Sequence, residues 1–102
     1  MFVYDNNNVL IELIAENVFL ARGYKEGSRF PEPSSWVLTA VVKGDLVHLM
    51  GLVSTGERDL KNTKEIHKFF KSLGYKKCEY FRDRGQGALY NVKRDYNAKF
   101  KY

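Results

Sequence analysis

The most continuous hydrophobic pattern lies in the middle of the chain. Residues 36–43 and 46–54 are nearly unbroken runs of apolar and β-branched side chains, and only Gly44-Asp45 separates them. Such runs predict β-strands, and a two-residue connection that begins with glycine predicts a tight hairpin. Because both faces of each run are apolar, we expect these strands at the centre of a sheet, covered on one side and partly on the other.

A second hairpin is predicted closer to the end of the chain. Residues 75–82 and 88–94 flank the turn-forming sequence Asp83-Arg84-Gly85-Gln86-Gly87. Apolar and charged side chains alternate within these two runs, and successive side chains of a strand point to opposite faces. The pattern therefore predicts a hairpin with one packed face and one exposed face.

Two segments carry apolar side chains close to helical spacing. Residues 9–22 are preceded by Asn8, a good helix N-cap, and followed by Gly23, which suits the position just past a helix end. Residues 59–73 show an apolar stripe with lysines on the opposite side, and Gly74 closes the segment. We predict a helix in each segment, the first one well buried.

These elements follow one another in the order β-α-β-β-α-β-β, with a short first strand at residues 2–4. This order predicts a single α+β domain over residues 1–102, in which a mainly antiparallel sheet is packed with two helices. Residues 24–35 contain two prolines two positions apart, so they are predicted to be a loop within this domain.

Charge divides the chain into two unlike parts. The net charge is +5, but residues 1–57 carry four Lys or Arg against seven Asp or Glu, whereas residues 58–102 carry thirteen against five. The second part therefore has a net charge of +8 and also holds nine of the fifteen aromatic residues. This polarity favours a partner that is itself negatively charged.

From this polarity we predict a small, non-catalytic binding protein that engages nucleic acid or an acidic protein through its basic part. Lysines recurring at three- and four-residue steps are expected to line one helix face, and arginines and lysines of the later hairpin to extend that surface. The candidate residues for an anionic partner are Lys61, Lys64, Lys68, Lys71, Arg82, Arg84, Lys93 and Arg94.

Other candidate chemistry has a simpler structural interpretation. His48 has no acidic residue or second histidine at a matching spacing, so a core histidine is favoured, and His67 is interpreted as part of the lysine-rich helix face. Cys78 alternates with Tyr80 toward the packed face, which favours a buried thiol over a nucleophile. Gly85-Gln86-Gly87 precedes a strand and not a helix, so it is interpreted as a turn. No catalytic, cofactor or metal residue is assigned, and the prediction leans against an enzyme.

The segment Ile66-His67-Lys68-Phe69-Phe70-Lys71-Ser72-Leu73-Gly74-Tyr75 resembles the late helix and Leu-Gly turn of the GNAT acetyltransferase superfamily. The hairpin around Lys43-Gly44-Asp45 is similar to the central hairpin of that family. The order of elements resembles most the small acetyltransferase-like internal virion proteins of podoviruses. The resemblance implies a truncated GNAT-like fold, and a ferredoxin-like sheet with an added strand is the alternative with the same element order.

Enzymes of that superfamily bind the pyrophosphate of acetyl-CoA with a glycine-rich loop at a helix start. The matching sequence here, Ser54-Thr55-Gly56-Glu57-Arg58-Asp59-Leu60, has one glycine and two acidic side chains. We therefore expect no cofactor for the binding protein. The alternative function that the resemblance implies is a divergent acyl-CoA-dependent N-acetyltransferase, for which acetyl-CoA is the cofactor.

Further expectations concern surroundings and assembly. No apolar run is long enough for a membrane span, and residues 1–8 lack the pattern of a secretory signal. The cytoplasm, including that of an infected host cell, or a virion is the expected location. Tyr96, Phe100 and Tyr102 share one side of the alternating tail, which predicts a homodimer contact through the tail.

Overall fold

The structure is a computed structural model that describes residues 1–54, 60–83 and 89–96; the side chains of residues 54, 60–62, 82, 83, 89 and 90 lie outside this description. The described elements follow the order β1-β2-β3-β4-β5-α1-β6-β7. Their bounds are β1 Phe2–Asn6, β2 Val9–Ala15, β3 Val18–Gly23, β4 Trp36–Lys43, β5 Leu46–Ser54, α1 Leu60–Ser72, β6 Lys77–Asp83 and β7 Leu89–Asp95.

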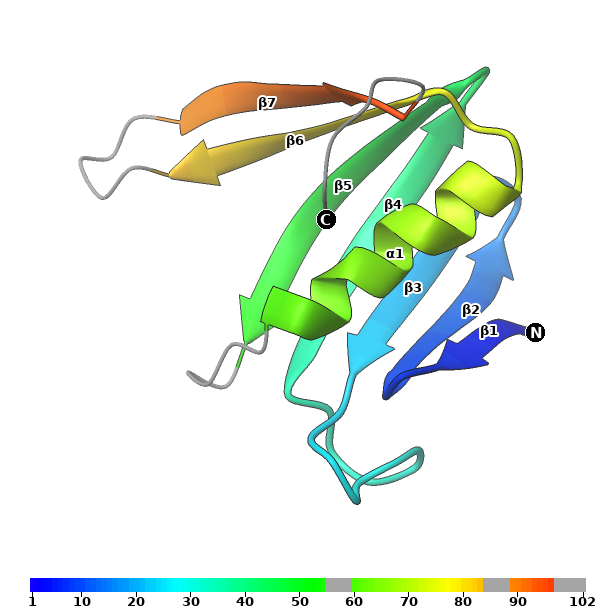
Figure 1. Ribbon diagram of the computed structural model, residues 1–102, viewed down its shortest axis with the longest axis vertical. Helices are drawn as coiled ribbons and strands as arrows, with labels where there is room; N and C mark the ends of the chain where they lie inside the picture. Colours follow the sequence, from blue (N-terminus) through cyan, green and yellow to red (C-terminus); the bar gives the residue numbers. More distant parts are fainter. Residues whose placement is uncertain (55–59, 84–88, 97–102) are drawn as a thin grey trace.

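The seven strands form one sheet in which neighbours in space are neighbours in the chain. Every adjacent pair is antiparallel except β5 and β6, which are parallel. A parallel pair needs a crossover connection. Helix α1, which follows β5 and precedes β6 in the chain, supplies it by running across one face of the sheet (Figure 1). The result is a mixed sheet with a helix on one face.

The predicted fold class is wrong, because residues 9–22 form the strands β2 and β3 and not a helix. Asn7 and Asn8 have φ angles of 50° and 64°, and Asn17 has a φ of 62°. Positive φ at both central residues is the signature of a two-residue hairpin turn, and asparagine tolerates it well. With a single helix in the described part of the chain, neither the two-helix acetyltransferase-like arrangement nor the ferredoxin-like alternative describes the fold.

The remaining strand and helix predictions are confirmed, whereas the predicted turn residues Arg84-Gly85-Gln86-Gly87 lie outside the described residues. Strands β4 and β5 have the predicted bounds and meet at Gly44, whose φ is 59°. Helix α1 and the β6–β7 hairpin lie within one or two residues of their predicted limits. Gly74, with a φ of 93°, follows the helix as expected for a residue just past a helix end.

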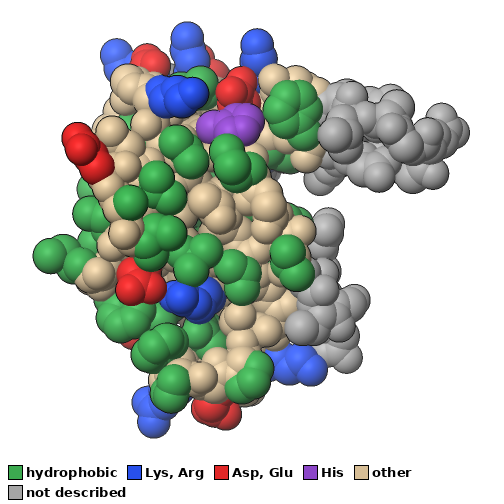
Figure 2. Space-filling view, turned by 180° about the vertical axis from the view of Figure 1, so that it is seen from behind, with side chains coloured by type: hydrophobic (Ala, Val, Ile, Leu, Met, Phe, Trp, Pro, Cys, Tyr) green, Lys and Arg blue, Asp and Glu red, His purple; other side chains and the backbone are tan. Residues whose placement is uncertain are grey.

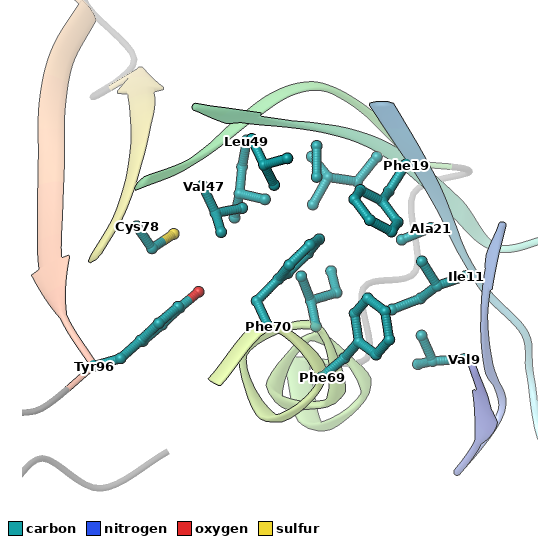
Figure 3. Close-up of a cluster of buried hydrophobic side chains, with 14 of the residues drawn as sticks. Val9, Ile11, Phe19, Ala21, Val47, Leu49, Phe69, Phe70, Cys78 and Tyr96 are labelled. Atoms are coloured by element: carbon teal, nitrogen blue, oxygen red, sulfur yellow. The ribbon is translucent and has the colours of Figure 1, made fainter. Parts of the chain in front are cut away.

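The hydrophobic core lies between α1 and the face of the sheet that it covers (Figure 3). Phe70 is fully buried and meets the ring of Phe19 edge to face at 5.2 Å, while Phe69 contacts the same ring at 5.8 Å. Ile66, one turn earlier on the helix, is also buried. Burying three large side chains of one helix face is the main contribution of α1 to stability.

Gly23 at the end of β3 lets the indole of Trp36 lie closer to the backbone than any residue with a Cβ would allow. It pairs with Trp36 across the sheet, and a Cβ built on Gly23 would lie 1.9 Å from the indole Nε1 of Trp36. Trp36 is itself only 2 % exposed, so the indole has no free space into which to move. The large side chain on β4 thus fills the space that the glycine leaves on β3.

We expect Gly23→Ala to lower the free energy of unfolding by about 1–3 kcal/mol, because overpacking a filled core costs this much. Chemical denaturation of Gly23→Ala, Trp36→Leu and the double variant measures the coupling between the two positions. The alanine should cost less when position 36 is leucine. An equal cost in both backgrounds would show that the contact with Trp36 is not the cause.

Candidate functional site

A row of exposed lysines lies on the outer side of α1. Lys64, Lys68 and Lys71 stand four and three positions apart, which places them on one helix face, and all three are exposed. We call these three residues the lysine stripe. Lys61 lies on the same helix one turn earlier, with its side chain outside the described residues. The predicted grouping of the helix lysines is therefore confirmed for three of the four.

Glu65 fixes the rotation of the helix that carries this stripe. It is 3 % exposed, and its carboxylate accepts hydrogen bonds from the hydroxyl of Tyr4, from the side-chain amide of Asn7 and, at 3.4 Å, from Lys68 Nζ. Burial disfavours the charged carboxylate, but these hydrogen bonds and the charge of Lys68 outweigh it and lower the pKa of Glu65. One buried anion thus links α1 to the β1–β2 hairpin.

The other predicted cationic residues do not join the lysine stripe. Lys93 is exposed on β7 and opposite Glu79 of β6, on the sheet face that α1 does not cover. Arg94 points to the helix side, where its guanidinium lies 6.0 Å from the ring centre of Tyr80. The side chain of Arg82 and all of Arg84 lie outside the described residues. The eight candidate residues therefore do not form one described surface.

A buried polar cluster lies where α1 meets β6 and β7. His67 Nδ1 and the hydroxyl of Tyr96 share a hydrogen bond of 2.8 Å, and the same hydroxyl bonds the Cys78 thiol. Burial, helped by the charge of Arg94, lowers the pKa of His67 to about 4, and burial raises the pKa of Cys78. A neutral imidazole and a protonated thiol fit an interior contact. The prediction for Cys78 is confirmed, whereas the interpretation of His67 as a residue of the lysine-rich face is wrong.

Strands β5 and β6 run side by side only at their beginning. Residues 46–49 of β5 pair with residues 77–80 of β6, and Figure 1 shows the two strands diverging beyond this point. There β5 also carries a β-bulge, because Val37 pairs with Val53 but Thr39 pairs with Met50. Gly51, with a φ of 66°, lies inside the bulge. A bulge leaves backbone groups outside the regular pattern of hydrogen bonds between strands, so the backbone of β5 is irregular between Met50 and Val53.

On the sheet face opposite α1, beside the exposed Lys93, charged or titratable side chains form two pairs. Arg22 on β3 and Glu12 on β2 form an ion pair of 3.1 Å. His48 on β5 donates a ring N–H to the carboxylate of Glu79 on β6 at 3.0 Å. The prediction of a core histidine is therefore wrong, because His48 is only partly buried and bonds a residue 31 positions away. Because the two residues lie on different strands, the spacing of residues within one segment could not predict this pair.

Hydrophobic side chains surround the two pairs on this face (Figure 2). No described residue outside the sheet covers most of it, although Phe30 of the 24–35 loop contacts Phe2 and lies under Arg22 at one end. No group of three metal-ligating side chains occurs among residues 1–54, 60–83 and 89–96. Over the same residues, no helix has the length and apolar character of a membrane span.

Comparisons of the chain with protein-family models, with curated proteins and with solved structures gave no match.

The His67 cluster predicts how stability depends on pH. A pKa near 4 in the folded protein against about 6.5 in the unfolded chain means that protons favour unfolding. The stabilising contribution of neutral His67 is thus complete above pH 6.5 and is lost progressively as the pH falls toward 4. His67→Gln should therefore show a smaller loss of unfolding free energy between pH 7 and 4.5 than the unchanged protein, measured by urea denaturation. His48→Gln serves as control, and equal losses in the unchanged protein and His67→Gln would contradict the assignment.

Proposed function

We propose that the protein is a non-catalytic nucleic-acid-binding protein that contacts the phosphate backbone through the lysine stripe of α1. The observation that carries the proposal is the exposure of Lys64, Lys68 and Lys71 along one face of a helix whose other face is fixed in the core. With a rise of about 1.5 Å per residue, the stripe spans about 10 Å, which suits successive phosphates of one strand. The cytoplasm is the proposed location.

The surroundings of the stripe support an anionic partner. Glu65, the acidic residue within the helix segment between Lys64 and Lys71, is buried and turned toward Tyr4 and Asn7, and Lys68, whose side chain stays 59 % exposed, donates to it at 3.4 Å. The outer face between these two lysines therefore carries positive charge without exposed carboxylates of its own. Lys76, five residues beyond the stripe, is also exposed and basic. Such a face attracts polyanions over several ångströms and binds them less tightly as salt rises.

We expect a fluorescently labelled single strand and its duplex to bind the protein at low salt and to dissociate steeply as salt rises from about 50 to 200 mM. Replacing the stripe by glutamine (Lys64→Gln, Lys68→Gln, Lys71→Gln) should reduce the slope of log K against log salt by about 2–3 for the duplex, since each lost phosphate contact removes about 0.9. Fluorescence anisotropy measures both effects.

A matched control removes three positive charges elsewhere: Lys25→Gln, Arg29→Gln and Lys43→Gln, all at exposed positions. This variant has the same net charge as the stripe variant but should keep most of the slope. Equal loss in both variants would show that only net charge matters and would reject the stripe as the site. Competition by polyglutamate as effective as that by the oligonucleotide, charge for charge, would identify an acidic protein as the partner instead.

A second candidate function, an acyl-CoA-dependent transferase, is favoured by the divergence of β5 from β6 together with the bulge at Gly51. In sheets with parallel strands, ligands bind beyond the carboxyl ends where strands separate. An extended chain with amide groups, such as the pantetheine arm of a coenzyme A thioester, hydrogen-bonds to an unpaired strand edge there. The acidic Glu57 and Asp59 in the sequence before α1 count against it.

Isothermal titration with acetyl-CoA distinguishes the two functions. If the protein is a transferase of this kind, acetyl-CoA should bind with a dissociation constant in the micromolar range, which is typical of enzyme substrates. A nucleic-acid-binding protein that acts through α1 should release no specific heat with acetyl-CoA even at about 1 mM. Coenzyme A without the acetyl group is the control for binding through the phosphates alone.

A further inference from the structure

The two edges of the sheet differ in how well they are protected against pairing with another strand. Strand β1, at one edge, has five residues, and its register with β2 shifts between Phe2 and Tyr4. Strand β7, at the other edge, pairs with β6 over seven residues without a shift and contains neither proline nor glycine. Short strands and bulges protect an edge, whereas a longer regular strand offers its backbone to a further strand. Of the two edges, the one formed by β7 is therefore the more open.

The hydrogen bonds of β7 show which of its backbone groups face this edge. In an antiparallel pair, residues that bond the neighbouring strand alternate with residues whose N–H and C=O point away from it. The N–H of Tyr96 donates at 2.7 Å to the carbonyl just before β6, so Arg94 and Val92, two and four residues earlier, also bond β6. The N–H and C=O groups of Lys93 and Asn91 then point outward, where no described strand pairs with them.

The backbone of β6 gives the same alternation independently. The N–H of Lys77 donates at 3.1 Å to the carbonyl of Asp45, which directly precedes β5, so Lys77 faces β5. Cys78, the next residue, then faces β7, where it is opposite Arg94. Two sets of hydrogen bonds therefore agree that Arg94 bonds inward and that Lys93 faces the free edge.

The side chains along this edge favour an acidic strand. Lys93 is exposed on the sheet face that α1 does not cover, and it forms no ion pair with a described residue. Arg94 lies on the helix side, so cations stand at two successive positions, one on each face. Opposite charges directly across from each other stabilise a strand pair, and a lysine on an edge strand discourages pairing with a like-charged strand.

From these features we infer that the free edge of β7 binds an extended acidic segment of a partner protein, which joins the sheet as an additional antiparallel strand. Its main chain bonds Lys93 and Asn91. One carboxylate lies opposite Lys93, the next residue places a second carboxylate opposite Arg94, and an apolar side chain lies opposite the half-buried Val92. Strand addition takes its affinity from main-chain hydrogen bonds and its specificity from alternate side chains. The edge is separate from the lysine stripe, so the inference does not depend on nucleic-acid binding.

A second copy of β7 is a poorer occupant of this edge. Antiparallel pairing of two copies about Val92 sets Lys93 opposite the uncharged Asn91, and pairing about Lys93 sets two lysines opposite each other. Pairing about Arg94 brings Lys93 to Asp95 but sets two arginines opposite each other. Like charges directly opposite destabilise a strand pair. A segment with two successive carboxylates meets both cations without such a conflict.

The chain's own tail is also a poorer occupant. The residues after Tyr96 include two lysines and no acidic residue, so they bring no carboxylate to Lys93. Tyr96 itself is 1 % exposed, and its ring lies beside Cys78 on the α1 side of the sheet (Figure 3). Its burial removes it from the predicted homodimer contact through the tail, and the other residues of that contact, Phe100 and Tyr102, lie outside the described residues.

Amide hydrogen exchange of the full chain, followed residue by residue by NMR, tests the free edge. The amides of Asn91 and Lys93 should exchange at least about tenfold faster than those of Val92 and Arg94, which bond β6. Slow exchange at all four amides would show that the tail or a second copy already occupies the edge and would overturn the inference. Loss of that protection on dilution would identify the second copy.

The probe for the partner is a synthetic peptide, Thr-Glu-Glu-Val-Thr-Val, with both ends blocked. In an antiparallel pair its glutamates lie opposite Arg94 and Lys93. We expect it to slow exchange at Asn91 and Lys93 and to bind with a dissociation constant below about 1 mM at low salt. Thr-Lys-Lys-Val-Thr-Val should not bind. An N-methyl group on the second glutamate removes the N–H that bonds Lys93 and should weaken binding about tenfold. Equal binding of the methylated peptide would overturn the inference.

Variants of the protein locate the contact. Lys93→Gln should weaken binding of the acidic peptide about two- to fivefold, whereas Lys43→Gln, at an exposed position on β4, removes the same charge and should not. Asn91→Pro removes an outward N–H without removing a bond to β6, and should weaken binding about fivefold. Circular dichroism checks folding. If Asn91→Pro fails to fold, Lys93→Gln and the methylated peptide decide the matter.

The glutamine variant of the lysine stripe separates this inference from the proposed function. It should bind the acidic peptide as the unchanged protein does, even where it has lost nucleic acid. Loss of peptide binding in that variant, or equal loss in Lys93→Gln and Lys43→Gln, would show that the peptide does not pair with β7 and would overturn the inference.

Discussion

The packing of one helix against one face of the sheet is the constraint on which the rest of the described structure depends. Ile66, Phe69 and Phe70 fill the space over strands β2 to β5, and the main cluster of buried hydrophobic side chains lies on that side. A single helix about 10 Å wide covers only part of one face of a seven-stranded sheet. The one-sided core and the apolar side chains exposed on the other face of the sheet are therefore two consequences of the same shortage of covering elements.

The same packing explains why the charge polarity of the sequence becomes a polarity in space. The acidic part of the chain supplies strands β1 to β5, and the basic part supplies the helix layer and the β6–β7 hairpin. Glu65 and the aromatic side chains fix the rotation of α1, so the lysine stripe faces away from the sheet. The lysine stripe and the sheet face that α1 does not cover then lie on opposite sides of the sheet.

Local sequence patterns predicted α1, the hairpin of β4 and β5 and the hairpin of β6 and β7, because each has one dominant periodicity and a clear turn. Residues 9–22 lack one. Their apolar positions fit a helix, but they also fit two strands whose turns depend on asparagines with positive φ. Gly23 was ambiguous in the same way, since it suits a helix end and also a strand position under a tryptophan. Pairing with β4, which is strongly β-forming, decides between the two, and this is a tertiary effect that a local window does not contain.

The candidate sites follow the same division between local and long-range information. The lysine stripe was predictable because its members share one helix, whereas the His48–Glu79 pair was not. These two residues meet only because α1 carries the chain across the sheet and sets β6 parallel to β5 in a register that opposes them. The apolar character of the sheet face that α1 does not cover was partly predictable, since both faces of residues 36–54 are apolar and only one helix follows them. Two helices, as predicted, would have had the second apolar face to cover. With residues 9–22 extended as strands, that face widens by two strands and has no second helix over it, so apolar side chains that a second helix would have buried are exposed instead.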